Sequence, residues 1–289
     1  MRLLALDTST RYASIALVTE GIEEKDVGAS GEYGEYTWYT GNNHNVDIFE
    51  YMQRLLDESD VTFQDLDGIC VATGPGSFNG VRVAVATAKT LAFTLQKPLL
   101  GISTLDVIAA QQRYAPQLIC ALLEAGRGDL YAACYRFASQ VDDTGMLDFA
   151  LTRQSEYLML PPTQVAEHMS TLLTPSETST SQTYERADRV LFCGDISNAS
   201  RLALREALPE QSLFVSRNQS MRHASVLAWL GRQRLQMGQV DDPMLLEPLY
   251  LRRPSITTST RKQLRLGAAE HSTQQAAVQS EREEGALHH

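Results

Sequence analysis

Signals that direct a chain out of the cytoplasm are missing from this sequence. The apolar start at residues 3–6 stops at Asp7, well short of a signal-peptide core. No apolar run approaches the roughly 20 residues that a membrane span requires. The cysteines are far apart and form no C-x-x-C pair; there are four, Cys70, Cys120, Cys134 and Cys193. We therefore expect a cytoplasmic protein with buried free thiols and no membrane contact.

Positive charge is also scarce. The chain has 25 Lys and Arg against 35 Asp and Glu, a net charge of −10. A free-standing nucleic-acid binder carries the opposite balance, because phosphate contacts need Lys and Arg. A role on RNA therefore requires a partner protein or a local basic patch. One stretch near the end has no acidic residue and suits such a contact, although a solvated tail is the simpler interpretation: Arg252, Arg253, Arg261, Lys262 and Arg265.

Motifs of metal and nucleophile chemistry are missing as well. His44, His168 and His223 lie far apart, and no H-E-x-x-H or H-x-x-x-H pair places two ligands on one helix face. No G-x-S-x-G elbow indicates a Ser/His/Asp triad. We predict structural roles for these histidines, no metal site and no catalytic residue.

What is present is a globular α/β chain. Its 289 residues are 43% hydrophobic and 21% charged, which suffices for two modest domains or one large one. Strands alternate with helices, and a hairpin around residues 126–129 makes the sheets mixed rather than parallel. Expected strands are residues 3–6, 12–18, 31–41, 67–73, 99–102, 118–124, 130–137 and 190–193, and expected helices are 44–58, 81–95, 103–112, 162–172, 197–207 and 221–237.

The heptad Gly-Pro-Gly-Ser-Phe-Asn-Gly at residues 74–80 joins a buried strand to a helix. It is neither a Walker A loop, since no Gly-Lys-Ser/Thr ends it, nor G-x-G-x-x-G, because Asn79 takes the place of the third glycine. Backbone N–H groups of Gly74, Gly76 and Ser77 at the helix start suit a weak phosphate contact. A turn that only fixes the helix angle explains the heptad equally.

A second polar turn, Asp7-Thr8-Ser9-Thr10, lies between two strands. Asp7 and Thr8 offer a carboxylate and a hydroxyl to a metal–phosphate group. Turn-stabilising side chains explain the same residues.

The helix at residues 81–95 is apolar nearly all round, with Arg82 and Lys89 as its charges. Small residues recur every four positions at Ala84, Ala88 and Ala92, so that a second helix can come close. The helix is therefore either buried in its own domain or covered by a partner. The preceding helix favours the partner slightly, because acidic residues flank its apolar stripe: Asp47, Glu50, Asp57 and Glu58.

Taken together, these motifs resemble the TsaB (YeaZ) family, the accessory proteins of bacterial tRNA threonylcarbamoyladenosine (t6A) synthesis. The order and spacing hold over roughly residues 1–135. Asn79 stands where the family usually has Thr, and Glu124-Ala125-Gly126 replaces an Asp-Ala-Arg run. The matching segments are residues 3–10, the helix start at His44, 74–82, 86–92, 101–105, 128–131 and 248–252.

The resemblance implies an actin/Hsp70-like fold (ASKHA, ribonuclease H-like) with two lobes of mixed sheets flanked by helices. The lobes are expected at residues 1–103 and 104–255, with C-terminal helices packing back on the first lobe. Nine of the fourteen residues from 170 to 183 are Ser or Thr, so we expect a disordered insertion near 170–186. A flexible tail is expected at residues 256–289.

The resemblance also implies a non-catalytic scaffold. It binds the paralogue TsaD as a heterodimer and supports transfer of a threonylcarbamoyl group to N6 of adenosine 37 in ANN-decoding tRNAs. The ATPase TsaE joins through that pair, tRNA binds only through the complex, and the same surface allows a homodimer. The chain has no cofactor of its own, because ATP and metal belong to the partner proteins.

The partner surface implied by the resemblance lies on two helices. TsaD has a pair of metal-binding histidines on one helix, whereas here Ile48 stands four residues after His44, so a single imidazole remains. The expected interface residues are His44, Ile48, Met52, Leu55, Arg82, Val85, Ala88, Lys89 and Ala92. Two alternatives stay open: a kinase-like ATP-dependent enzyme that uses Asp7 and the heptad, and a glycoprotease-like metallohydrolase.

Overall fold

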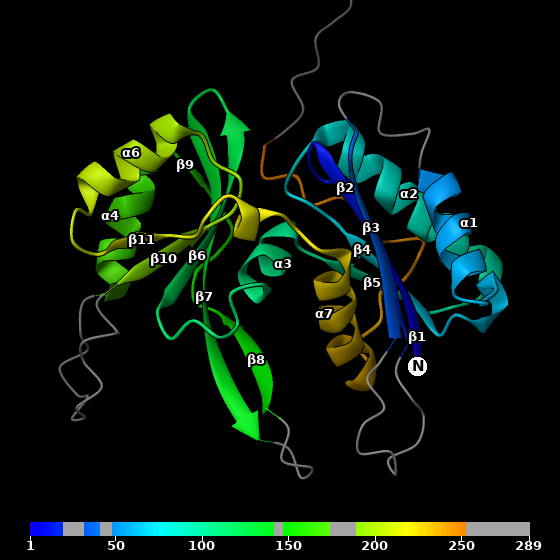
Figure 1. Ribbon diagram of the computed structural model, residues 1–289. Coiled ribbons are helices and arrows are strands. Elements are labelled where there is room, and N and C mark those ends of the chain that lie inside the picture. Colours follow the sequence, from blue (N-terminus) through cyan, green and yellow to red (C-terminus); the bar gives the residue numbers. More distant parts are fainter. Residues whose placement is uncertain (20–31, 41–47, 142–146, 174–188, 253–289) are drawn as a thin grey trace, which may run out of the picture. The chain divides into compact units, whose positions relative to one another are not determined.

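The computed structural model describes residues 1–19, 32–40, 48–141, 147–173 and 189–252 (Figure 1). The expectations for His44, for the tail at residues 256–289 and for most of the Ser/Thr-rich insertion lie outside these ranges. The boundaries expected at residues 103 and 255 stay a prediction.

The first sheet has five strands in the order β3-β2-β1-β4-β5. The central strand β1 pairs antiparallel with β2 (Leu4 opposite Leu17) and parallel with β4 (Ala5 opposite Cys70). Continuous apolar runs form the middle strands because both faces of the sheet are covered. The strands are β1 (Arg2–Asp7), β2 (Tyr12–Thr19), β3 (Glu32–Tyr39), β4 (Gly68–Ala72) and β5 (Leu99–Ile102).

Helices cover both faces of this sheet. Helices α1 (Ile48–Glu58) and α2 (Phe78–Leu95) pack on the face that carries Leu4 and Leu6. Helix α7 (Ala224–Gln236) packs on the opposite face, against Leu3 and other side chains of alternating positions. The first sheet is therefore completed by a helix that follows the second sheet in the chain.

The second sheet has six strands, five of them in the order β11-β10-β6-β7-β8, with β9 paired to β7. Helices α4 (Pro162–Leu173) and α6 (Asn198–Ala207) cover one face and α3 (Thr104–Ala110) packs on the other. The strands are β6 (Leu118–Gly126), β7 (Asp129–Val141), β8 (Leu147–Arg153), β9 (Leu158–Leu160), β10 (Val190–Cys193) and β11 (Ser212–Phe214); short 3-10 helices η1 (Phe63–Asp65) and η2 (Asn218–Ser220) complete the list.

These elements confirm the predicted α/β class with mixed sheets flanked by helices. Strands β8, β9 and β11 were not predicted, although β8 (LDFALTR) alternates apolar and polar residues at its start. Helix α2 begins three residues earlier than predicted, because Ser77 caps it, and α7 begins three residues later.

All four cysteines are buried free thiols, as predicted. Burial raises the pKa of the Cys70 thiol to about 12 and that of Cys193 well above its ordinary value. Among the described helices, none combines the length and apolar character needed to cross a bilayer.

Candidate functional site

The two polar turns singled out in the sequence lie against each other. The Thr8 hydroxyl donates a hydrogen bond to the carbonyl oxygen of Gly80 at 2.6 Å, and the Ser77 N–H donates to the carbonyl oxygen of Ser9, also at 2.6 Å. A Cβ atom on Gly76 would lie 2.1 Å from the Ser9 oxygen, and one on Gly80 would lie 2.0 Å from the Thr8 oxygen. Both glycines are therefore required for this close approach.

The heptad thus acts as a turn that fixes the start of α2. The Ser77 side chain accepts a hydrogen bond from the Gly80 N–H and so caps the helix. Of the residues predicted to contact phosphate, Gly76 and Ser77 line a pocket, whereas Asp7, Thr8 and Gly74 are buried and do not line it.

Asp7 is held by an arginine that sequence reasoning missed. Its carboxylate is 1% exposed and accepts hydrogen bonds from the Ser9 N–H at 2.8 Å, from the Ser9 hydroxyl at 2.6 Å and from Arg222 Nε at 2.8 Å. Arg222 is itself buried and also donates to Thr10 Oγ1 at 2.6 Å and to the Tyr12 carbonyl oxygen at 3.2 Å. The charge of Asp7 is therefore neutralised within the chain, and the Ser9 contacts fit the turn-stabilising interpretation of this segment.

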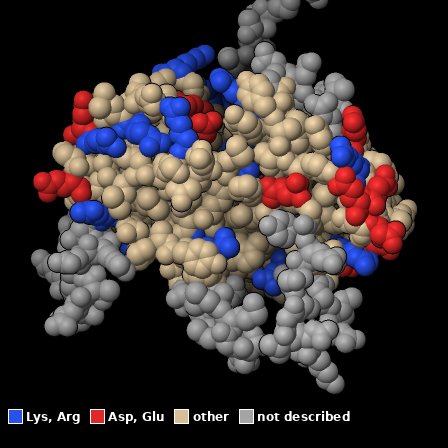
Figure 2. Space-filling view, in the orientation of Figure 1, with Lys and Arg blue, Asp and Glu red and all other residues tan. Residues whose placement is uncertain are grey.

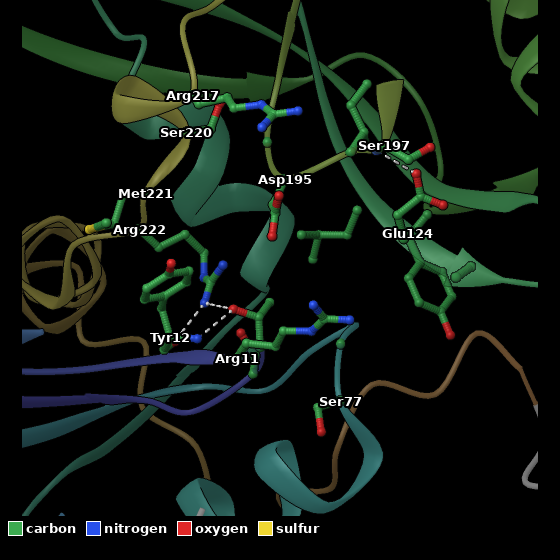
Figure 3. A pocket seen from close by; sticks show the side chains of 18 of the residues that line it. Arg11, Tyr12, Ser77, Glu124, Asp195, Ser197, Arg217, Ser220, Met221 and Arg222 are labelled. Carbon is green, nitrogen blue, oxygen red and sulfur yellow. Dashed lines mark hydrogen bonds between the residues drawn. The ribbon is translucent and has the colours of Figure 1, made fainter. Parts of the chain in front are cut away.

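Side chains from both sheets surround the pocket, which has a volume of about 860 Å³ (Figure 3). The turn before β2, the heptad, the β6–β7 hairpin, the start of α6 and the segment after β11 line it. Glu124 accepts hydrogen bonds from the Ser197 N–H at 2.8 Å and from the Ser200 hydroxyl at 2.7 Å, so this carboxylate fixes the first turn of α6. The charged side chains of the lining are Arg11, Glu124, Asp195, Arg201, Arg217 and Arg222.

Most of the predicted partner surface needs correction. Six of its apolar side chains are buried in the chain's own core against the first sheet, with Ala88 at 0% exposure. They are not accessible to another protein in this conformation because α1 and α2 turn this stripe towards β1, β2 and β4. The six are Ile48, Met52, Leu55, Val85, Ala88 and Ala92.

The two predicted charged contacts lie elsewhere on α2. Arg82 is exposed and its guanidinium lies 4.4 Å from the centre of the Phe78 ring. Lys89 Nζ donates to the carbonyl oxygen of Leu246 at 2.9 Å, so it holds the C-terminal segment on the first sheet.

Other side chains of α1 and α2 face solvent. Phe49 is 58% exposed and Phe93 is 61% exposed, and Phe78 at the start of α2 is also exposed. The exposed groups of α2 were missed because a helix that is apolar nearly all round gives no sign of which side faces the sheet, whereas Phe49 lies next to the apolar stripe of α1 in the sequence.

Of the described histidines, His223 has a structural side-chain contact, whereas the buried Nε2 of His168 has no hydrogen-bond partner. His223 Nδ1 lies 2.8 Å from Glu35 Oε1. This hydrogen bond raises the pKa of His223; burial alone would raise the pKa of Glu35, but the hydrogen bonds from His223 and Ser225 lower it overall. Within the described ranges, no three His, Cys, Asp or Glu side chains are grouped as metal ligands.

Comparisons with known proteins agree with the resemblance. A family model described as "TsaD: tRNA N6-adenosine threonylcarbamoyltransferase" matches residues 39–259. The "tRNA threonylcarbamoyladenosine biosynthesis protein TsaB" of Bacillus subtilis is 30% identical over 87% of this chain and 94% of its own length. The protein of the same name in Escherichia coli is 32% identical over 50% of this chain and 58% of its own.

The transferase relatives match a smaller part. A "tRNA N6-adenosine threonylcarbamoyltransferase" of Methylorubrum populi is 33% identical over 39% of this chain and 36% of its own length. Among solved structures, "YeaZ from Pseudomonas aeruginosa" covers 86% of this chain and all of its own, at 25% identity and a TM-score of 0.61. These matches confirm the YeaZ-type fold, with mixed sheets flanked by helices, that the resemblance implied. The chain belongs to the TsaB (YeaZ) family of tRNA threonylcarbamoyladenosine biosynthesis proteins.

Proposed function

We propose that this chain is a non-catalytic subunit that binds a TsaD-type transferase and supports threonylcarbamoyl transfer to N6 of adenosine 37 in ANN-decoding tRNAs. The observation that carries the non-catalytic role is the pairing of Asp7 with Arg222. A TsaE-type ATPase and tRNA then join through the pair, and ATP and metal are held by the partner proteins.

The Asp7–Arg222 pair argues against nucleotide chemistry in the chain's own pocket. An ATP-dependent enzyme of this fold would use that carboxylate to hold a metal–phosphate group. Here the metal–phosphate group would have to displace an ion pair whose side chains are 4% and 1% exposed. Removing one partner of such a pair costs about 3–5 kcal/mol, because the other charge is left buried and alone.

The outer side of α1 and α2 is the surface that we assign to the partner. Helices of 11 and 18 residues are about 16 and 27 Å long. Packed against a matching pair of helices, they would bury an interface on the order of 1,600 Å². Phe49 and Phe93 are its exposed apolar anchors. A TsaD-type partner fits because the transferases share similarity with this chain and so offer equivalent helices; the same surface allows a homodimer.

A size-exclusion experiment tests the pairing. The doubly substituted chain Phe49→Glu/Phe93→Glu is mixed with the TsaD-type transferase of the same organism, beside the unchanged chain. We expect the heterodimer peak to disappear, because two carboxylates would be buried without partners, while the circular dichroism spectrum stays native. Leu202→Glu, at a 56% exposed position on α6, is the matched control and should leave the heterodimer intact. A heterodimer that survives the double substitution contradicts the assigned surface.

The kinase-like alternative has one feature in its favour, a pocket of about 860 Å³ that Gly76 and Ser77 line. Calorimetric titration of the isolated chain with Mg-ATP separates the two functions. We expect no tight binding and no turnover. Tight binding that Asp7→Asn abolishes would favour the enzyme instead.

A further inference from the structure

Three arginines lie close together on the second sheet, and we call them the α6 arginine cluster: Arg201, Arg205 and Arg217. Arg201 and Arg205 are four residues apart on α6, and both guanidinium groups lie over the ring of Phe214, at 5.0 and 5.4 Å from its centre. Arg217 lies just after β11 and donates to Asn198 Oδ1 at 2.8 Å, at the first turn of the same helix.

No carboxylate in the described part of the chain forms an ion pair with any of the three. Arg201 is half-buried, as are Arg234 and Arg252, which pair with Asp241 and Asp129, whereas Arg205 and Arg217 are exposed. Among the described residues, Arg201 donates hydrogen bonds only to the Val215 carbonyl oxygen, from both terminal nitrogens at 3.5 Å. Burial, and then the positive charges of Arg217 and Arg205, lower the pKa of Arg201. The fold thus holds three like charges together without neutralising them.

The cluster extends from the pocket onto the outer surface. Arg201 and Arg217 line the pocket, with Arg11 contributing a further guanidinium to its wall (Figure 3). Arg205 does not line the pocket, and it lies about 6 Å further along the α6 axis. Figure 2 shows Lys and Arg side chains gathered over the region of α6, whereas Asp and Glu gather over the region of α1.

This arrangement suits an extended polyanion better than a compact one. Inside the pocket, Asp195 and Glu124 offset part of the positive charge of the lining arginines, so a small anion held there is attracted less strongly than one at the rim. A phosphodiester backbone that runs along the rim meets Arg217, Arg201 and Arg205 in turn and stays clear of the interior. Guanidinium groups bind phosphate oxygens through two parallel hydrogen bonds, and such contacts position RNA without reading its sequence.

We propose that the α6 arginine cluster binds the phosphodiester backbone of tRNA. The choice of tRNA rests on the proposed function in t6A synthesis, whereas the surface itself is independent of the α1–α2 partner face. Because the chain has a net charge of −10, the contact is weak in the isolated chain and adds to the affinity of the assembled complex.

Fluorescence anisotropy of the full chain with a labelled unmodified tRNA transcript at low salt tests the proposal. Arg205→Gln/Arg217→Gln should weaken binding about tenfold or more and reduce the slope of log K against log salt by about two, one unit for each lost phosphate contact. Arg54→Gln removes an exposed arginine on α1 and should change neither quantity. No detectable tRNA binding by the unchanged chain at low salt, or equal losses for both variants, would overturn the proposal.

A substitution that should strengthen tRNA binding provides a second test. Asp195→Asn removes the carboxylate from the pocket and should raise tRNA affinity about twofold to threefold, because a nearby like charge is lost. No increase would overturn the placement of the backbone at this rim.

Two further measurements exclude the other anions. Suppose that ATP binds the isolated chain and displaces tRNA, and that Arg205→Gln/Arg217→Gln weakens this ATP binding. The cluster then binds a free nucleotide and the proposal fails. If that variant keeps its tRNA affinity but loses the heterodimer in size exclusion, the cluster docks an acidic protein surface and the proposal fails as well. A heterodimer lost only in Phe49→Glu/Phe93→Glu concerns the proposed function and leaves the tRNA contact in place.

Discussion

Helices α2 and α6 occupy equivalent positions, each covering one face of a mixed sheet, yet their outer sides differ. Helix α2 exposes Phe93 and, about two turns earlier on the same side, Ala86, whereas α6 exposes Arg205 and carries Arg201 at a pocket. An outer side rich in phenylalanine is suited to a protein, and one rich in unpaired arginine is suited to phosphate. One chain can therefore meet two kinds of partner without either surface overlapping the other.

The inner sides differ as well. Helix α2 approaches its sheet through Ala84, Ala88 and Ala92, which allow a close contact, whereas α6 packs mainly through Leu204.

The largest effect is expected inside α2. Ala88→Glu should lower the free energy of unfolding by about 4 kcal/mol or more, because a carboxylate would be buried at a 0% exposed position without a partner. Ala86→Glu, two residues earlier on the exposed side, should change it by no more than about 0.5 kcal/mol. Urea unfolding followed by circular dichroism measures both. Equal stability of the two variants would mean that Ala88 faces outward.

The second-largest effect on stability is expected for the arginine that is paired, Arg222. Arg222→Gln should cost about 3 kcal/mol in unfolding free energy, because Asp7 is left buried and charged. Arg217→Gln, the exposed arginine five residues earlier, should cost no more than about 0.5 kcal/mol. Asp7→Asn added to Arg222→Gln should recover part of the loss. A similar cost for both arginines would contradict the distinction between paired and unpaired groups.

A smaller effect is expected inside α6. Leu204→Ala should cost about 2–3 kcal/mol, since Leu204 packs in the core of the second sheet and its removal leaves a cavity. Leu202→Ala, at 56% exposure on the same helix, should be close to neutral. Thermal unfolding of both variants gives the comparison; if the Leu202 variant is the less stable, the assigned inner side of α6 is incorrect.

The smallest effect depends on pH. The raised pKa of His223 gives a contribution to stability that is complete below its ordinary value of 6.5 and lost as pH rises through the folded value. The lowered pKa of Glu35 gives one that is complete above 4.5 and lost as pH falls through the folded value. The His223–Glu35 pair therefore stabilises the folded chain most between pH 4.5 and pH 6.5. Because His223 is half exposed, His223→Gln should cost less than about 1 kcal/mol there and nothing at about pH 9; an equal cost at both pH values would show that charge is not involved.

Sequence patterns predicted many of the helices and strands, but few of the contacts between residues that are far apart in the chain. The strands at residues 67–73 and 118–124 were predicted because long apolar runs mark buried strands, whereas β11 has only three residues and no such mark. The heptad was identified as a helix-starting turn. Its contact with the turn at Asp7 was not, since only the folded chain brings Thr8 to Gly80.

The candidate site shows the same limit. Asp7 was singled out, but Arg222 lies 215 residues away and no local pattern links the two. The α6 arginine cluster was hidden for a related reason, because Arg201, Arg205 and Arg217 come from two segments and carry no motif. The uniformly apolar sequence of α2 could not distinguish Ala88, which is core, from Phe93, which is exposed.

The placement of α7 has a consequence for synthesis on the ribosome. One face of the first sheet is covered by residues 224–236, which are translated after every strand of both sheets. Until then, apolar side chains such as Leu3 and Leu100 are not covered by α7. The nascent amino-terminal half therefore exposes a hydrophobic surface to which chaperones can bind. A polypeptide released between residues 214 and 224 should consequently aggregate even though it contains all eleven described strands.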